Sequence, residues 1–308
     1  MGTLDIARYK KDKFLLAAII ITIIAGAYWS VYSLHAYNTF HEYDDLGIFS
    51  HNMWLDIHYP SMSYGFQFLV FGNHISPDLL LLAFPIFYLF QSSVTLLMIQ
   101  VLVLSITSLA IFLVSRDILK NSWMALLIFL AFVLNPGMHG MLVFDFHAES
   151  FIILFYVLVF YFYIKQYKLP FFISTLLLLG TIEEAPFLGI TLGAGLIFYE
   201  FVYHRHDGIF KSRLVYAGSL VGLSLIFLCL YMFITLSLQG AYASGAYPAL
   251  PKYLYVGNQL TGSFSVLVHN PAQNTSSSAY LPIQYFIYGL TAAFLFLGVA
   301  TLAVPITT

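Results

Sequence analysis

The chain alternates between long apolar runs and short polar segments, a pattern that predicts a bundle of membrane-spanning helices. A helix needs about 20 mostly apolar residues to cross the hydrocarbon core of a bilayer. We predict eight spans, several of them short. They are expected at residues 14–34, 93–115, 123–134, 150–164, 170–181, 186–203, 214–236 and 281–304.

The first loop is expected to contain an amphipathic helix that starts at Asp44, whose side chain suits the N-cap position. Leu46, Phe49 and Met53 recur at helical spacing and form one apolar stripe. Such a stripe favours a helix that lies in the membrane interface. We therefore predict an interfacial helix in this loop.

Two further sequence features bear on the spans. Residues 78–90 are apolar but short and contain Pro85, which indicates an interfacial or re-entrant helix. The third span is expected to end at Asn135, because Asn-Pro-Gly is a helix-stop sequence.

The composition supports a membrane protein. The chain has 308 residues, of which 60% are hydrophobic and only 8% are charged, and its mean hydropathy is +0.86. Soluble domains carry about 25% charged residues. We therefore predict an all-α polytopic protein with a single integral membrane domain over residues 1–308. Its core is expected at about 14–238, with a last outer loop and final helix at 239–308.

The basic residues predict the orientation of this domain. If the N-terminus is cytoplasmic, eleven of the twelve Lys and Arg residues fall on the cytoplasmic side, and only Lys252 falls outside. Multi-pass proteins of the cell membrane show this positive-inside bias. The net charge of −2 gives no reason to expect a nucleic-acid partner.

The same topology gathers acidic residues at the outer face, where three separate segments deliver them. An ionisable residue near the membrane is a candidate for function by default. The outer acids are Glu42, Asp44, Asp45, Asp56, Asp78, Asp145, Glu149, Glu183 and Glu184.

The first of these segments, the first outer loop, carries two candidate sites, and each has both a chemical and a purely structural interpretation. Asp44 and Asp45 are either a catalytic carboxylate with its neighbour or the start of a capped interfacial helix. His74 lies in a turn before Pro77. It binds a phosphate, a metal or an acid, or it is a solvated loop histidine.

The other two segments leave the same choice open. Asp145, His147 and Glu149 form a set that binds a divalent ion or caps the following helix. Glu183 and Glu184 lie between two short spans, either as a functional pair or as acids of a solvated hairpin.

Four segments together resemble a known family. YDDLGIFSHNMW, GNHISPD, FDFHAES and TIEEAP occur in the order typical of the prokaryotic membrane proteins called domain of unknown function 2079. The resemblance covers about residues 35–200. The chain departs from the family pattern at Ala148, where proline is expected, and at Ile182-Glu183-Glu184, where Lys-Glu-Asp is expected.

That family is distantly similar to the GT-C glycosyltransferases, which are polytopic enzymes that use polyprenyl-phosphate sugars. The resemblance implies a GT-C-like arrangement and transfer of a sugar at the outer face. It implies a base or metal-organising role for Asp44 or Asp45. In such a transfer we expect Asp45 or Asp44 to act as catalytic base, and His74, His147 and Glu183 to contact the substrate. A divalent cation, Mg²⁺ or Mn²⁺, would be held by Asp145, Glu149 and Glu184, since Lys252 is the one outer cation expected.

Two other functions remain open at this point. A non-enzymatic membrane subunit or scaffold would use the outer acids to bind membrane-protein partners, besides the surrounding membrane lipid. An ion-coupled transporter would use Glu183 and Glu184. It would also need acids at mid-membrane in both halves of the chain.

Overall fold

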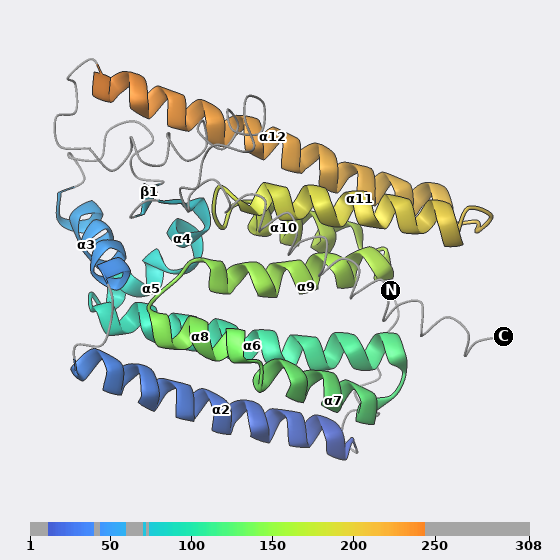
Figure 1. The fold of residues 1–308 in the computed structure, drawn as a ribbon, viewed down its shortest axis with the longest axis horizontal. Helices are drawn as coiled ribbons and strands as arrows, with labels where there is room; N and C mark the ends of the chain where they lie inside the picture. Colours follow the sequence, from blue (N-terminus) through green and yellow to red (C-terminus); the bar gives the residue numbers. More distant parts are fainter. Residues whose placement is uncertain (1–11, 40–43, 60–69, 72–73, 244–308) are drawn as a thin grey trace, which may run out of the picture.

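The computed structural model describes residues 12–39, 44–59, 70–71 and 74–243, which form a bundle of helices (Figure 1). Within these residues, four helices are long and apolar enough to cross a membrane. They are α2 (Lys13–Asn38), α6 (Ser93–Leu119), α11 (Ala185–Tyr203) and α12 (Phe210–Ala243). A bent pair makes a fifth span if it is counted as one; it consists of α7 (Ser122–Val133) and α8 (Pro136–Phe144).

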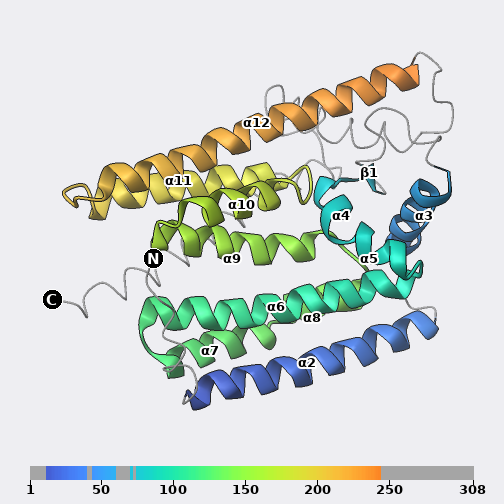
Figure 2. The same ribbon diagram turned by 180° about the vertical axis from the view of Figure 1, so that it is seen from behind.

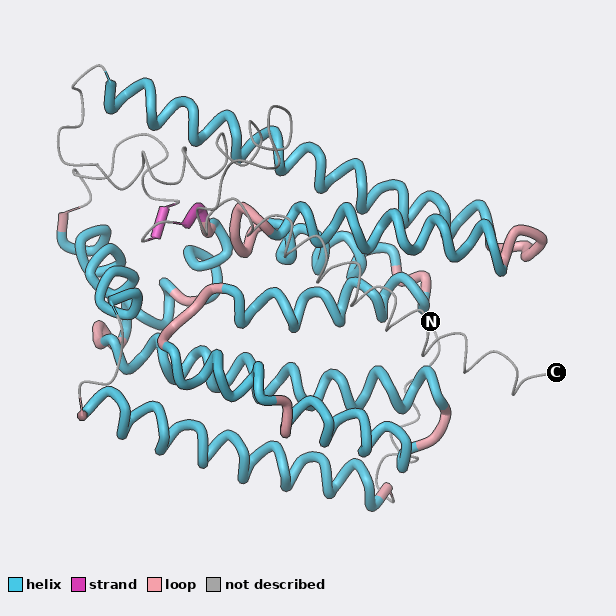
Figure 3. The backbone as a smooth tube through the Cα atoms, viewed as in Figure 1, coloured by secondary structure: helices cyan, strands magenta, loops and turns pink. Residues whose placement is uncertain are grey.

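The remaining elements are shorter (Figure 3). They are α3 (Asp44–His58), α4 (Pro77–Leu82), α5 (Phe84–Leu89), α9 (Glu149–Lys165) and α10 (Lys168–Leu179). Two short strands, β1 (Val70–Phe71) and β2 (His74–Ile75), pair antiparallel. The polytopic, mainly helical class is thus confirmed, whereas the count of eight spans stays a prediction. The eighth span and its preceding loop lie outside the described residues.

Helix α6 is the centre of the bundle. It packs against α2 and α7 on one side and against α9 on the other, as both views show (Figures 1 and 2). Leu104 and Phe112 of α6 belong to a core shared with α2, α7 and α8, while Leu96 belongs to a second core shared with α3, α9 and α11. One helix therefore joins both halves of the protein.

Helix α2 lies at the edge and presents an apolar surface to its surroundings. Ile23, Ile24 and Val31 are 65%, 62% and 68% exposed, respectively. A soluble protein rarely leaves so continuous an apolar patch in water. Contact with lipid removes the free-energy cost of exposing these side chains to water. This surface therefore agrees with the predicted first span.

The apolar stripe of α3 faces the protein and not the membrane. Leu46, Phe49 and Met53 are 3%, 3% and 0% exposed, and the ring of Phe49 meets that of Phe146 with centroids 5.3 Å apart. The expectation that this stripe faces the membrane interface was wrong. A period of 3.6 residues marks a buried face without telling whether lipid or protein covers it.

The Asn-Pro-Gly sequence ends α7, as predicted, and a new helix starts directly after it. Helix α7 ends at Val133, close to the predicted end, but α8 begins at once with Pro136 in its first turn. Asn135 Oδ1 accepts the backbone N–H of Gly137 at 2.7 Å and so caps α8. The two helices meet at a bend of 47°.

Residues 78–90 form most of one short helix and all of a second, where a single interfacial or re-entrant helix was expected. Ala83 separates α4 from α5, and Pro85 lies in the first turn of α5. Leu79, Ala83 and Phe87 are buried against the core.

Candidate functional site

The bundle has one basic end and one acidic end. The basic end contains the start of α2 and the turns α6–α7, α9–α10 and α11–α12 (Figure 1). Every described Lys and Arg lies there: Lys13, Arg116, Lys120, Lys165, Lys168, Arg205, Lys211 and Arg213. The opposite end contains α3, the strand pair and the α8–α9 and α10–α11 connections. Its described acids are Asp44, Asp45, Asp56, Asp78, Asp145, Glu149, Glu183 and Glu184.

Acids at the basic end have basic partners. Asp12 caps α2 by accepting the backbone N–H of Phe14, and its other oxygen lies 3.2 Å from Arg116 Nη1 and 2.7 Å from Ser122 Oγ. Asp117 contacts Lys120 and Lys165 in the same way. At the opposite end, no described Lys or Arg forms an ion pair with Asp45, Asp78, Asp145, Glu149, Glu183 or Glu184.

His74 and Glu183 form the centre of the acidic end. Glu183 Oε1 lies 3.0 Å from His74 Nδ1, and Glu183 Oε2 accepts the backbone N–H of Ile75 at 2.9 Å. The Glu183 carboxylate therefore binds two adjacent residues of β2, His74 and Ile75. Since Glu183 is only 2% exposed, these contacts hold it in one orientation.

A close contact between two turns brings these residues together. Pro77 begins α4 directly after β2, and the next backbone N–H, that of Asp78, donates to the carbonyl of Gly180 at 3.0 Å. The Asp78 side chain occupies the space beside Gly180, where an added Cβ would collide with Asp78 Oδ1. Any larger residue at this position would force Asp78 to shift. The α10–α11 connection is thereby fixed against the start of α4.

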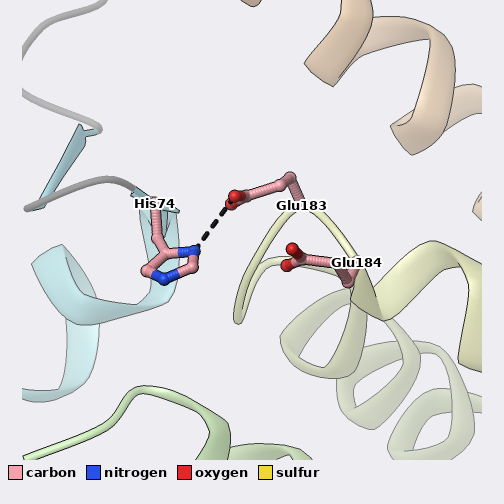
Figure 4. A group of neighbouring side chains, drawn as sticks. All are labelled: His74, Glu183 and Glu184. Atoms are coloured by element: carbon pink, nitrogen blue, oxygen red, sulfur yellow. Dashed lines mark hydrogen bonds and ion pairs between the residues drawn. The ribbon is translucent and has the colours of Figure 1, made fainter. Parts of the chain in front are cut away.

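Glu184 completes the group. Its carboxylate faces His74 and Glu183 (Figure 4), and ligand atoms of these three residues lie within 4.8 Å of one another. Glu184 Oε2 is buried and has no hydrogen-bond partner among the described residues. Of the described side chains, this is the group whose spacing suits a metal ion.

Burial and charge change the pKa values of this group. Burial lowers the pKa of His74, but the charge of Glu183 and the hydrogen bond to it raise that pKa, with a net result well above the usual value. Burial and the neighbouring charge of Glu183 raise the pKa of Glu184 to about 8. Burial likewise raises the pKa of Asp78 to about 8, offset only in part by the Thr181 side chain.

Asp45 and His147 form a second pair at the same end. Asp45 Oδ2 lies 3.5 Å from His147 Nε2, and their side chains are 40% and 21% exposed. Asp45 comes from the first turn of α3 and His147 from the α8–α9 connection. Unlike Glu183, this carboxylate is open to the surroundings.

Asp145 and Gln100 position this pair. Asp145 Oδ2 accepts the N–H of Leu46 at 2.9 Å, which ties the α8–α9 connection to the first turn of α3. Gln100 Nε2 donates to the carbonyl of Asp145 at 2.8 Å, while Gln100 Oε1 accepts the N–H of His147 at 2.7 Å. Both side chains are buried and act on the backbone around the pair.

The structure divides the predicted site residues between these two groups. His74, Glu183 and Glu184 lie together, and Asp45 lies beside His147.

Of the predicted metal ligands Asp145, Glu149 and Glu184, only Glu184 belongs to the three-ligand group. Both oxygens of Asp145 accept backbone N–H groups. Glu149 acts on His74 and Glu184 through its charge. The side chain of Asp44 is outside what the structure describes.

Sequence reasoning missed Gln100 and gave Asp78 no role beyond its place at the outer face. A signal existed for Gln100, since an amide within a 27-residue apolar helix needs polar partners. Asp78 follows Pro77 in a turn, and nothing local distinguishes it from a solvated helix-start acid.

The helical fold, with basic residues at one end of the bundle and acidic residues at the other, is that of a multi-pass membrane protein with an acidic site. A family model described as "Predicted membrane protein (DUF2079)" matches residues 16–305, and the chain belongs to that family. The family resemblance inferred from the four short segments is thus confirmed. No curated protein and no solved structure matches the chain.

Proposed function

We propose that this protein is a GT-C-like membrane glycosyltransferase that moves a sugar from a polyprenyl-phosphate donor to an acceptor. One observation carries the proposal. The half-exposed carboxylate of Asp45 lies beside His147, at the same end of the bundle as the group of His74, Glu183 and Glu184. A carboxylate that is both exposed and positioned can take a proton from a bound hydroxyl group.

The proposed reaction is a single displacement. The acceptor oxygen forms a bond to the anomeric carbon as its proton passes to Asp45. The bond from that carbon to the phosphate oxygen breaks, and the lipid phosphate leaves with the electron pair. His147 holds Asp45 in place through the 3.5 Å contact. Asp44 stays the alternative base.

The leaving phosphate is an anion at an end already rich in acids. A divalent cation bound there would neutralise that charge. His147 and His74 are two described side chains at this end that can donate hydrogen bonds to phosphate or sugar oxygens. This combination supports a metal-dependent transfer.

The proposed site faces the outside of the cell, with the N-terminus in the cytoplasm. The gathering of all described Lys and Arg residues at one end of the bundle supports this orientation. Residues 1–308 form a single membrane domain in this proposal, with an outer loop and a final helix after residue 238.

The test uses the full chain in lipid nanodiscs with labelled polyprenyl-phosphate hexoses. Release of the label to water or to an added acceptor reports turnover. Asp45→Asn should reduce turnover at least about 100-fold, the usual loss for a general base. Asp56→Asn makes the same change three turns along the same helix and should stay within about twofold, because this residue lies outside both groups.

Two results would count against the proposal. Full turnover in Asp45→Asn would remove its role as base. A wild-type protein that binds no donor lipid but co-purifies with a stable membrane partner would favour the scaffold function instead.

A further inference from the structure

We propose that His74, Glu183 and Glu184 bind one divalent transition-metal ion of the Mn²⁺ or Zn²⁺ class. This inference deepens the proposed function, and it rests on that function only for the part the ion plays in transfer. Binding itself needs no donor lipid and no acceptor. It can therefore be tested separately.

The spacing of the ligand atoms fits a shared ion. Two ligands bound about 2.1 Å from a metal at a right angle lie about 3.0 Å apart. His74 Nδ1 and Glu183 Oε1 are 3.0 Å apart, and one ligand atom from each of His74, Glu183 and Glu184 lies within 4.8 Å of the other two. Two ligands on opposite sides of one such ion lie about 4.2 Å apart, so a shared coordination sphere requires these atoms to come no farther apart than that.

The group is held in place by its surroundings. The N–H of Ile75 occupies Glu183 Oε2 and leaves Oε1 directed at His74. The bond from Asp78 N–H to the carbonyl of Gly180 fixes the two turns that carry the ligands. Outer contacts of this kind orient ligands and raise metal affinity.

The buried carboxylate oxygen of Glu184 is independent evidence that this group binds an ion. Its Oε2 is buried without a hydrogen bond among the described residues, and its carboxylate faces the other two side chains (Figure 4). A buried carboxylate oxygen without a partner is costly. Glu149 adds a further negative charge that acts on His74 and Glu184. A dication would give this oxygen a partner and offset the negative charge of the group.

The imidazole determines the class of ion. Mg²⁺ and Ca²⁺ prefer oxygen ligands alone, whereas imidazole suits ions such as Zn²⁺, and Mn²⁺ accepts a mixed set with carboxylates. One nitrogen and two carboxylates therefore favour Mn²⁺ or Zn²⁺ over Mg²⁺. Of the two ions predicted from the sequence, Mg²⁺ and Mn²⁺, this site therefore favours Mn²⁺.

The experiment measures Mn²⁺ binding to the chelator-treated full chain in nanodiscs, by the loss of the spectroscopic signal of free Mn²⁺. We expect one bound ion per chain, displaced by Zn²⁺ but not by equal Mg²⁺. Nitrogen hyperfine coupling in the pulsed spectrum of bound Mn²⁺ should report the imidazole. Glu184→Gln should weaken binding at least tenfold, and His74→Asn should abolish the nitrogen coupling. Asp56→Asn should change neither.

The wild-type spectrum decides the matter even if a variant fails to fold. Bound Mn²⁺ without nitrogen coupling would overturn the site, as would the absence of a bound ion. Equal displacement by Mg²⁺ would overturn the ion class. Metal binding that survives with no sugar transfer would leave this site standing and remove the proposed function.

Discussion

Asp78 and Gly180 hold the acidic end together by a reciprocal fit. The backbone N–H of Asp78 donates to the carbonyl of Gly180 at 3.0 Å, and the Asp78 side chain fills the space that a Cβ at residue 180 would need. This contact joins the turn after His74 to the turn before Glu183. The candidate metal ligands meet because these two turns meet.

Gly180→Ala should therefore destabilise the protein. The new Cβ collides with Asp78 Oδ1 and crowds the carbonyl of Leu176, and overpacking of this kind costs about 1–3 kcal/mol. Thermal unfolding in nanodiscs measures the loss. Gly222→Ala is the matched control, since nothing lies within 4 Å of its Cβ position and it lies within a helix. If both variants unfold alike, the contact has no special role.

Asp78→Asn should remove a pH dependence of stability. The folded protein holds the Asp78 proton up to about pH 8, whereas an unfolded chain releases it near the usual value of 3.8. The folded state thus binds more protons between these values, and stability falls as pH rises through this window, by up to about 1.4 kcal/mol per unit.

The asparagine variant has no proton to lose at this position. Its stability relative to wild type should therefore rise from pH 5 to pH 8, as measured by denaturant unfolding in detergent at both values. Asp56→Asn serves as control and should show no such trend. A constant difference between Asp78→Asn and wild type across this range would contradict the buried, protonated state.

Gln100→Leu should unfold more easily and disturb the Asp45–His147 pair. The change removes the hydrogen bonds of Gln100 to the backbone of Met141, Asp145 and His147. Leaving such groups unpaired costs about 2–4 kcal/mol in total. Leu102→Ala, on an exposed part of the same helix, should cost far less. Equal melting temperatures for the two variants would refute this role for Gln100.

Cysteine labelling tests which end faces outward. Cys229 is first replaced by Ser, and single cysteines are then placed at exposed Gln91 of the acidic end or exposed Gly208 of the basic end. In intact cells, a membrane-impermeant maleimide should label Gln91→Cys only, because basic ends stay in the cytoplasm. Labelling after lysis confirms that both sites are reactive. The reverse pattern in intact cells would invert the proposed orientation.

The spans could be predicted from sequence because lipid imposes a local rule. Residues 93–115 and 186–203 were expected to be helical, and the structure has α6 at Ser93–Leu119 and α11 at Ala185–Tyr203. A backbone in hydrocarbon must satisfy its own hydrogen bonds, so apolar length alone marks a helix. The separation of basic and acidic segments follows from the order of those helices along the chain.

By itself, then, the sequence determined the family, the helical membrane class and the gathering of acids at one end. Only the tertiary structure decided which acids pair. His74 and Glu183 are 109 residues apart, and their contact depends on how α4 and the α10–α11 turn pack around Gly180. The same holds for the apolar stripe that contains Leu46 and Met53. Its helical period predicts a buried face but does not tell whether protein or lipid covers that face. Long-range packing sets these relationships, and no local pattern records them.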